Sequence, residues 1–159
     1  MITPRKELFI TIKNKLKEIP ELEYIDLFRN QFNKEDKEDF PSYWTAVLIR
    51  INQITWDTMT EQHQEGRCSI DVILYCKDGW MDQHNNTSDP EDGLMEIDLL
   101  DAIAEKLQFL FGTQFKPLQH TDDETEEATM DEMMSYRQSF STMLYRTLAP
   151  KYQPKKIKF

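Results

Sequence analysis

Two apolar segments in the middle of the chain place the strongest limit on its fold. From residue 68 to residue 77, apolar and more polar side chains alternate with a period of two, which is typical of a β-strand. The apolar set on one face is Cys68, Ile70, Val72, Leu74 and Cys76. Residues 43–54 are apolar on both faces, as expected of a strand that is covered on both sides along part of its length. With a polar connection at 58–66 that ends in a predicted turn glycine, Gly66, the two segments are predicted to form a long antiparallel hairpin.

A helical pattern is expected on each side of this hairpin. The first helix has Thr3 as its predicted cap, Pro4 at its first position and Pro20 as its stop. The second helix is predicted to begin with Asp89 as cap and Pro90 at the first position, and to end at Gly112. The buried stripe of the first is predicted to be Leu8, Ile12, Leu16 and Ile19, and that of the second Leu94, Ile97, Leu100, Ile103, Ala104, Leu107, Leu110 and Phe111.

The remaining segments complete one domain. Residues 22–27 predict a weak first strand, residues 115–120 a short edge-like strand, residues 121–132 an acidic loop, and residues 135–145 a last strand. The order is therefore α-β-β-β-α-β-β. It predicts an α+β domain over residues 1–150, with a mixed, mainly antiparallel sheet of four to five strands and two helices packed on it. Residues 151–159 are a basic C-terminal tail.

The charge balance excludes some functions. Lys plus Arg number 19 against 29 Asp plus Glu, a net charge of -10, so a surface that clamps nucleic-acid phosphates is not expected. The four lysines of the tail leave the preceding 150 residues with 15 basic and 29 acidic side chains, a formal charge of -14. No apolar run approaches the roughly 20 residues that cross a bilayer, and the N-terminus has no signal-type apolar core. We expect no membrane association and a cytoplasmic origin.

The two cysteines are expected to be reduced and buried. Cys68 and Cys76 are eight residues apart on one face of the same predicted strand. At about 3.3 Å per residue they lie on the order of 26 Å apart, far beyond the reach of a disulfide.

No catalytic, metal-binding or cofactor-binding constellation is present in the sequence. The three histidines, His63, His84 and His120, fall in separate predicted loops without zinc-site spacing, and no Gly-x-Ser-x-Gly motif occurs. Asp71 fits the first carboxylate of a metal-dependent nuclease, but Tyr75 stands where the second acid is needed, two residues before Lys77. We therefore interpret Asp71 as an outward-facing strand residue, and expect a chain that is not an enzyme and uses no cofactor.

Several side chains are candidates for a protein interface. Trp80 and Met81 lie in a polar loop at 78–93, where they either fold back onto the domain's own core or anchor a partner surface. Trp56 and Met59 allow the same two interpretations. The acidic residues of the predicted loop, Asp122, Asp123 and Glu124, form a second candidate contact region. The tail lysines Lys155, Lys156 and Lys158 are suited to reach the acidic body of an identical neighbour in a head-to-tail ring.

Four features in this order resemble the tail terminator (tail completion) proteins of long-tailed bacteriophages and prophages. They are an amphipathic helix ending in Lys17-Glu18-Ile19-Pro20, a strand led by Pro41, its hairpin partner at 68–77, and a helix at 94–111 followed by two strands that end near Tyr145. The resemblance lies in order and length over nearly all of residues 5–148. The family has no diagnostic catalytic motif to match.

The resemblance implies a function in virion assembly. Such proteins have an α+β fold, form hexameric rings, cap the tail tube to stop its growth, and provide the surface to which the head is joined. The implied partners are further copies of the chain, a tail tube protein and a head-completion or connector protein, in the host cytoplasm during assembly and then in the virion tail. A lumen lined with carboxylates would repel DNA and let it slide through. A head–tail connector or minor tail protein of similar build is the nearest alternative. A small cytoplasmic adaptor or ligand-binding regulatory domain is an alternative of another class.

Overall fold

A computed structural model describes residues 2–32, 45–77, 85, 88–89, 93–127 and 133–150 of the chain. Its two helices and five strands follow the predicted α-β-β-β-α-β-β order, which confirms the α+β class. In chain order the elements are α1 (Pro4–Leu16), β1 (Tyr24–Leu27), β2 (Thr45–Thr58), β3 (His63–Lys77), α2 (Met95–Leu107), β4 (Gln119–Glu127) and β5 (Met133–Thr147).

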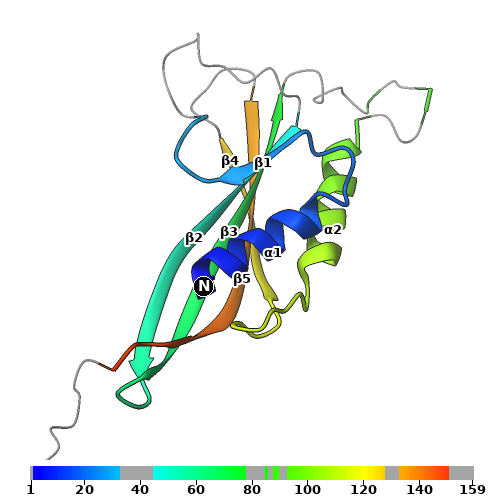
Figure 1. The fold of residues 1–159 in the computed structure, drawn as a ribbon. Coiled ribbons are helices and arrows are strands. Elements are labelled where there is room, and N and C mark those ends of the chain that lie inside the picture. The colour runs from blue at the N-terminus through cyan, green and yellow to red at the C-terminus, as the bar shows by residue number, and fades with distance from the viewer. Residues whose placement is uncertain are drawn as a thin grey trace, which may run out of the picture.

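The five strands form one sheet in the order β1-β2-β3-β5-β4. Only β1 runs parallel to its neighbour β2, and every other pairing is antiparallel. The predicted hairpin is the long β2–β3 pair, in which Ile49 lies opposite Val72. Both helices cover the same face of the sheet, and the lower part of β2, β3 and β5 extends beyond them (Figure 1).

The main core lies between the helices and the sheet. Leu8, Ile12 and Leu16 of α1 are fully buried, as predicted. The core side of β3 carries the predicted alternating set, which includes both cysteines. Cys68 and Cys76 are buried and free, in agreement with the prediction. Burial raises the pKa of the Cys68 thiol to about 11 and that of Cys76 to about 12.

A second, smaller cluster covers the opposite face at one end of the sheet. Phe32, Ala46, Leu48, Ile73 and Tyr75 are buried there, with Tyr24 and Phe28 packed against them. The Phe32 and Tyr75 rings meet edge to face, with centroids 4.9 Å apart. Residues 45–49 of β2 are consequently buried on both faces, as the sequence pattern predicts.

The bounds of the second helix differ from the prediction at both ends. α2 begins at Met95 with Leu94 as its cap, whereas Asp89 lies in an exposed bend. It ends at Leu107 and not at Gly112, because Phe109 has a positive φ of 64° and its N–H donates to the Leu118 carbonyl, which turns the chain back toward β4. The predicted stripe is wrong at two positions, since Ile97 and Phe111 are exposed, while Leu99, which the prediction left out, is buried.

The first helix also ends earlier than predicted. α1 stops at Leu16 with Lys17 as its C-terminal cap, and Pro20 lies after a short turn that still buries Ile19. Thr3 is the N-cap, although its hydroxyl makes no capping hydrogen bond.

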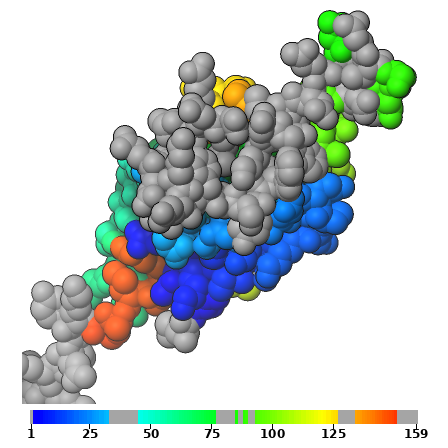
Figure 2. All heavy atoms as spheres, turned by 90° about the horizontal axis from the view of Figure 1, so that it is seen from above, coloured from blue at the N-terminus to red at the C-terminus, as the bar shows by residue number. Residues whose placement is uncertain are grey.

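The start of α1 (dark blue) lies next to the end of β5 (orange) in Figure 2. Gln114 connects the two, because its carbonyl accepts from Tyr145 N–H and its side chain donates to the Ile2 carbonyl.

The prediction that Gly66 ends a turn is wrong. The hairpin turn is confined to residues 59–62, and Gly66 lies inside β3 directly opposite Trp56. A Cβ at this position would meet the Ile54 side chain and the Trp56 ring at 2.8 Å. The glycine therefore leaves room for the Trp56 ring, and the Arg146 guanidinium lies 3.8 Å from the centre of that ring. Trp56 belongs to the domain's own packing, whereas Met59 in the turn is exposed.

The acidic segment is a strand and not the predicted loop, at least as far as residue 127. Gln119–Glu127 forms β4, which pairs along β5, while residues 128–132 lie outside the described part of the chain. The predicted strand at 115–120 is reduced to a single bridge between Phe115 and Leu144, and the ladder begins only after Pro117, which has no N–H to donate. β4 carries its acidic residues because it is an edge strand with exposed side chains on both faces. His63 and His120 accordingly lie in strands and not in loops.

Candidate functional site on the open face of the sheet

A strip of polar side chains crosses the sheet face that points away from α1 and α2, here called the open face. Alternation along β3 places Arg67, Ser69 and Asp71 on this face, in line with Ile73 and Tyr75 of the second apolar cluster. The strip divides into a charged cluster around Asp71 and a hollow around Arg67.

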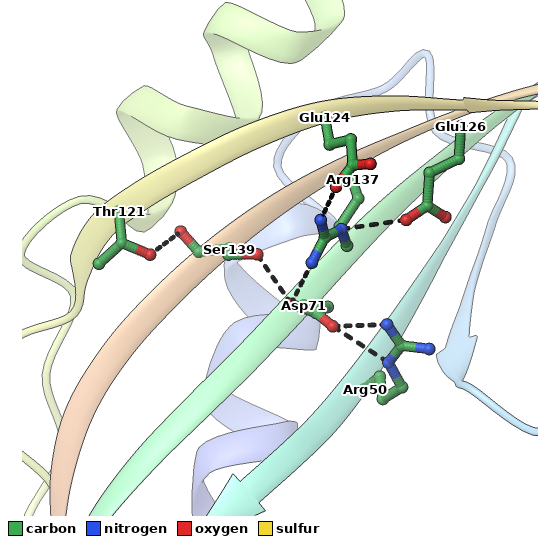
Figure 3. Close-up of polar contacts among 7 residues, drawn as sticks. All are labelled: Arg50, Asp71, Thr121, Glu124, Glu126, Arg137 and Ser139. Atoms are coloured by element: carbon green, nitrogen blue, oxygen red, sulfur yellow. Dashed lines mark hydrogen bonds and ion pairs between the residues drawn. The ribbon is translucent and has the colours of Figure 1, made fainter.

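Asp71 is the centre of the charged cluster and is only 1% exposed. It lies opposite Arg50 on β2 and opposite Ser139 on β5. Arg50 donates to Asp71 Oδ2 from Nη2 at 2.6 Å and from Nε at 3.1 Å, and Ser139 Oγ donates to Oδ1 at 2.8 Å (Figure 3). The interpretation of Asp71 as an outward-facing residue is therefore corrected: it lies on the face away from the helices, but paired side chains bury it.

Arg137 connects this carboxylate to the edge strand. Its guanidinium lies 3.9 Å from Asp71 Oδ1, donates to Glu124, and has its Nε 3.1 Å from Glu126 Oε1. Glu124 stands opposite Arg137 in the β4–β5 register, so the carboxylates that bind Arg137 belong to the paired strand β4 and not to a loop (Figure 3). Burial alone would lower the pKa of Arg137, but the hydrogen bond to Glu124 and the charges of Asp71, Glu124 and Glu126 raise it.

The charged cluster joins four strands and surrounds the Asp71 carboxylate with donors on both oxygens. Arg50 comes from β2, Asp71 from β3, Arg137 from β5 and the two glutamates from β4. Ser139 gives its proton to a carboxylate that two guanidiniums already hold, so it is not an activated nucleophile. Among the described residues no group of three or more His, Cys, Asp or Glu side chains is placed to hold a metal ion. The arrangement is suited to fixing the four strands relative to one another.

Next to the cluster lies a hollow of about 570 Å³, here called the strand hollow. It extends over the open-face side chains of three strands and is bordered by the segment that leads into β4. The lining side chains that face it are Gln53 and Thr55 of β2, Arg67 and Ser69 of β3, Ser141 and Met143 of β5, and Lys116, Pro117 and Gln119. Among the described residues, two cations, Arg67 and Lys116, line the hollow and no carboxylate does, although the chain as a whole has a net charge of -10.

The two cations of the hollow are held differently. The Lys116 ammonium lies 5.6 Å from the centre of the Tyr145 ring, and its contact with the Tyr145 hydroxyl raises the pKa of Lys116. The backbone of Lys116 is fixed to β5, because its N–H donates to the Met143 carbonyl and its carbonyl accepts from Thr142 Oγ1. Arg67 is exposed and, unlike Arg50 and Arg137, has no ion pair within the described residues.

Both edges of the sheet have backbone that no described strand pairs. β1 covers β2 only from Ala46 to Ile49, which leaves residues 50–58 of β2 without a neighbour on that side in the described part of the chain. The outer edge of β4 is likewise unpaired among the described residues. Such an edge presents N–H and carbonyl groups to which another strand can add.

The structure describes three of the predicted interface residues, all of them on one strand. Asp122, Asp123 and Glu124 lie in β4, where Glu124 binds Arg137 and Asp123 Oδ1 lies 2.6 Å from His120 Nε2. Asp122 is exposed and has no ion pair within the described residues. Trp80, Met81, Lys155, Lys156 and Lys158 lie outside the described residues.

Sequence reasoning missed the residues that make up the open face. One signal was available: Arg50 and Asp71 interrupt the two most apolar strands, and hairpin pairing places them opposite each other. Arg67 and Lys116 gave no such signal, because they come to line one hollow only through the fold of the chain between α2 and β4.

No helix in the described part of the chain has the length and apolar character needed to cross a bilayer. Comparison of the chain with protein-family models and with curated proteins gives no match.

Proposed function

We propose that this chain is a structural protein of a phage or prophage tail, which caps the end of the tail tube as a ring and presents the surface to which the head is joined. The observation that carries the proposal is a pair of sheet edges that no described strand pairs, residues 50–58 of β2 and the outer edge of β4. Two such edges at opposite ends of one sheet, unpaired within the described part of the chain, are suited to adding further copies of the chain. The order of elements resembles that of the tail terminator family, and this resemblance is the reason for proposing that the assembly belongs to a phage tail.

The charges of β4 favour head-to-tail addition. Two β4 edges placed side by side would bring Asp122, Asp123, Glu124 and Glu126 of one copy against the same residues of another. Like charges directly opposite each other destabilise strand pairing. The acidic edge therefore works against a symmetric dimer and favours pairing with a different edge, which is the arrangement that closes into rings.

The acidic body suits a channel for DNA. The first 150 residues carry a formal charge of -14, and α2 exposes Asp98, Asp101 and Glu105 to solvent. Carboxylates on a ring lumen repel phosphates, so DNA passes without binding. The partners of the ring would be the tail tube protein and a head-completion or connector protein, first in the host cytoplasm and then in the virion tail.

The experiment is native mass spectrometry of the purified chain over a wide concentration range, together with electron microscopy of tail tubes grown with and without it. We expect a species of six chains and tubes whose growth stops when the chain is added. A stable dimer with no larger species, and tubes that grow unchanged, would contradict the proposal.

A second candidate is a ligand-binding regulatory domain or adaptor, which the strand hollow favours. Its volume of about 570 Å³ lies within the ordinary range of ligand pockets, and its two cations would suit a small anion. Thermal denaturation in the presence of small carboxylates and phosphates separates the two functions. A strong rise in melting temperature with one such anion would favour the regulatory domain, and no rise with any would favour the tail protein.

A further inference from the structure

We propose that a hollow beside the start of α1, here called the α1 hollow, is the seat for residues 95–101 of α2 from a second copy of this chain. In this contact Ile97 of the second copy enters the hollow. Its Asp98 and Asp101 face Arg5 and Lys6 of the first copy. The inference rests on the proposed self-assembly and names two surfaces that meet in it.

The α1 hollow combines apolar side chains with cations. It has a volume of about 530 Å³ and lies between α1 and the edge of the sheet formed by β1 and β2. Its large apolar lining residues are Phe9, Leu27, Phe28 and Ile51, and among the described residues no carboxylate lines it. Such a surface favours an apolar side chain that has acids beside it.

Two cations of the hollow have no ion pair in the described part of the chain. Arg5 and Lys6 are exposed and unpaired there, whereas Arg50, the third cation of the lining, binds a buried carboxylate. The one acid of β1, Asp26, is paired with Arg29 at 3.3 Å. Arg5 and Lys6 can therefore bind carboxylates of another chain.

The first turns of α2 offer the matching side chains. Ile97 is 55% exposed. Asp101 follows it by four residues, so the two lie on one face of the helix, with Asp98 beside them. Both acids are exposed and form no ion pair within the described residues. This turn presents an apolar side chain between two carboxylates, which is what the α1 hollow is suited to receive.

The charges of the two helices favour a contact between unlike helices. α1 has four basic and one acidic side chain, a formal charge of +3, and α2 has four acidic and one basic side chain, a formal charge of -3. A two-fold contact of either helix with itself would place like charges together, whereas α1 of one copy against α2 of the next is a head-to-tail contact of opposite charges. It leaves Glu105 and the other acids of the body to line a channel.

The positions of the helices on the sheet allow this contact. Both helices cover the same face (Figure 1), and the α1 hollow lies at the β1–β2 edge. α2 lies toward the other edge, because Gln138 of β5 donates to its Leu100 carbonyl and the His120 N–H of β4 donates to Gln108 Oε1. When two copies stand edge to edge with their helices on the same side, α2 of one lies beside the α1 hollow of the next.

Charge reversal on each surface tests the proposal. We expect Lys6→Glu and Asp101→Lys each to raise the dissociation constant of the assembly by about tenfold or more, as for other close charge pairs at interfaces. Both side chains are exposed, so circular dichroism and melting temperature should stay at wild-type values. The matched controls are Lys116→Glu before β4 and Glu61→Lys in the hairpin turn, which change exposed charges outside the contact and should leave assembly intact.

The apolar part of the contact has its own variant. Ile97→Ser should weaken assembly without loss of fold, because the side chain is largely exposed in the single chain. Met59→Ser is the control, since Met59 is 63% exposed in the hairpin turn and lies outside the contact.

Mixing the two charge variants gives the sharper result. In the mixture each Lys6→Glu chain meets an Asp101→Lys chain on both sides, and opposite charges face each other at every contact. We expect each variant alone to assemble poorly and the equimolar mixture to assemble almost as well as wild type, with equal numbers of the two chains in the species seen by native mass spectrometry. A mixture that assembles no better than the separate variants would contradict the proposed pairing.

The outcomes separate this inference from the proposed function. If the wild-type chain assembles and both reversals assemble equally well, the seat is wrong while the ring proposal stands. If the wild-type chain assembles only at tube ends, the same variants are compared by tube growth, and reversals that stop growth as wild type does overturn the seat. If the wild-type chain stays monomeric at every concentration and does not stop tube growth, both proposals are overturned.

Discussion

Arg50 and Asp71 lie directly opposite each other on β2 and β3, and Arg50 Nη2 donates to Asp71 Oδ2 at 2.6 Å. Arg50 in turn places its guanidinium 4.9 Å from the centre of the Phe28 ring, so the ion pair touches the edge of the second apolar cluster. Because Asp71 is 1% exposed, its charge depends on these partners and not on water. The pair therefore marks the place where the apolar part of the open face becomes polar.

Asp71→Asn should destabilise the fold strongly. The variant leaves Arg50 and Arg137 facing a neutral amide in a buried position, and breaking a buried pair in this way costs about 3 kcal/mol. Urea denaturation measures the free energy of unfolding, with Asp101→Asn on the exposed face of α2 as the control, expected to change it by less than about 0.5 kcal/mol. A loss at Asp71 no larger than that of the control would contradict the assigned role.

Gly66→Ala should destabilise the hairpin through a clash with Trp56. The added methyl would lie 2.8 Å from both the Trp56 ring and the Ile54 side chain, and crowding of this kind costs about 1–3 kcal/mol. The same substitution in a Trp56→Leu background should cost less, because the ring that crowds it is gone. Unfolding free energies of the four proteins test this. Strict additivity of the two substitutions would show that Trp56 is not the residue that requires the glycine.

The hairpin and the helix core could be predicted because burial imposes a period on the sequence. In β3 apolar and polar residues alternate because one face of the strand packs on the helices. The alternation is visible in the sequence from Cys68 to Cys76. β4 could not be predicted in the same way. Asp122, Asp123, Glu124 and Glu126 have low strand propensity, and the strand forms because β5 offers a partner edge and Arg137 binds two of the acids.

The end of α2 could not be predicted from the local sequence either. Gly112 is a common helix stop, but the helix has already ended at Leu107, because the chain from 109 to 118 folds back on itself with hydrogen bonds between Leu118 and both Phe109 and Leu110. Gly112 is needed for another reason, since a Cβ there would clash with the side chains of Glu7 and Phe115. The contact with Glu7 joins residues more than a hundred positions apart, so the local sequence around Gly112 does not indicate it.

The two cysteines should be unreactive in the folded chain. Burial raises the pKa of Cys68 to about 11 and of Cys76 to about 12, so neither thiol ionises near neutral pH. An aromatic disulfide reagent at pH 8 should label neither cysteine in native buffer and both in concentrated denaturant. Because the folded pKa values lie above the unfolded value of about 8.5, the stability that these thiols contribute is present below that pH and is lost as the pH rises through the folded pKa values. Rapid native labelling of either cysteine would contradict its burial.

Glu7→Gln should loosen the contact between α1 and the segment after α2. The Glu7 carboxylate accepts hydrogen bonds from Thr113 N–H at 2.6 Å, from Thr113 Oγ1 at 2.9 Å and from Gln114 Nε2 at 2.6 Å. A glutamine amide reproduces only part of this set, so we expect a loss of about 1–2 kcal/mol at pH 7. Glu21→Gln, at an exposed position, is the matched control.

The pH dependence of that loss identifies the carboxylate as its cause. Burial alone would raise the pKa of Glu7, but the hydrogen bonds from Gln114 and Thr113 outweigh it and lower the pKa. The stability from Glu7 is therefore fully present above the unfolded pKa of about 4.3 and is lost as the pH falls through the lower, folded pKa. Melting temperatures of wild type and Glu7→Gln, measured from pH 7 down to pH 3, should differ most above pH 5 and converge in acid. A difference that stays constant over this range would mean that the substitution acts through packing and not through the charge.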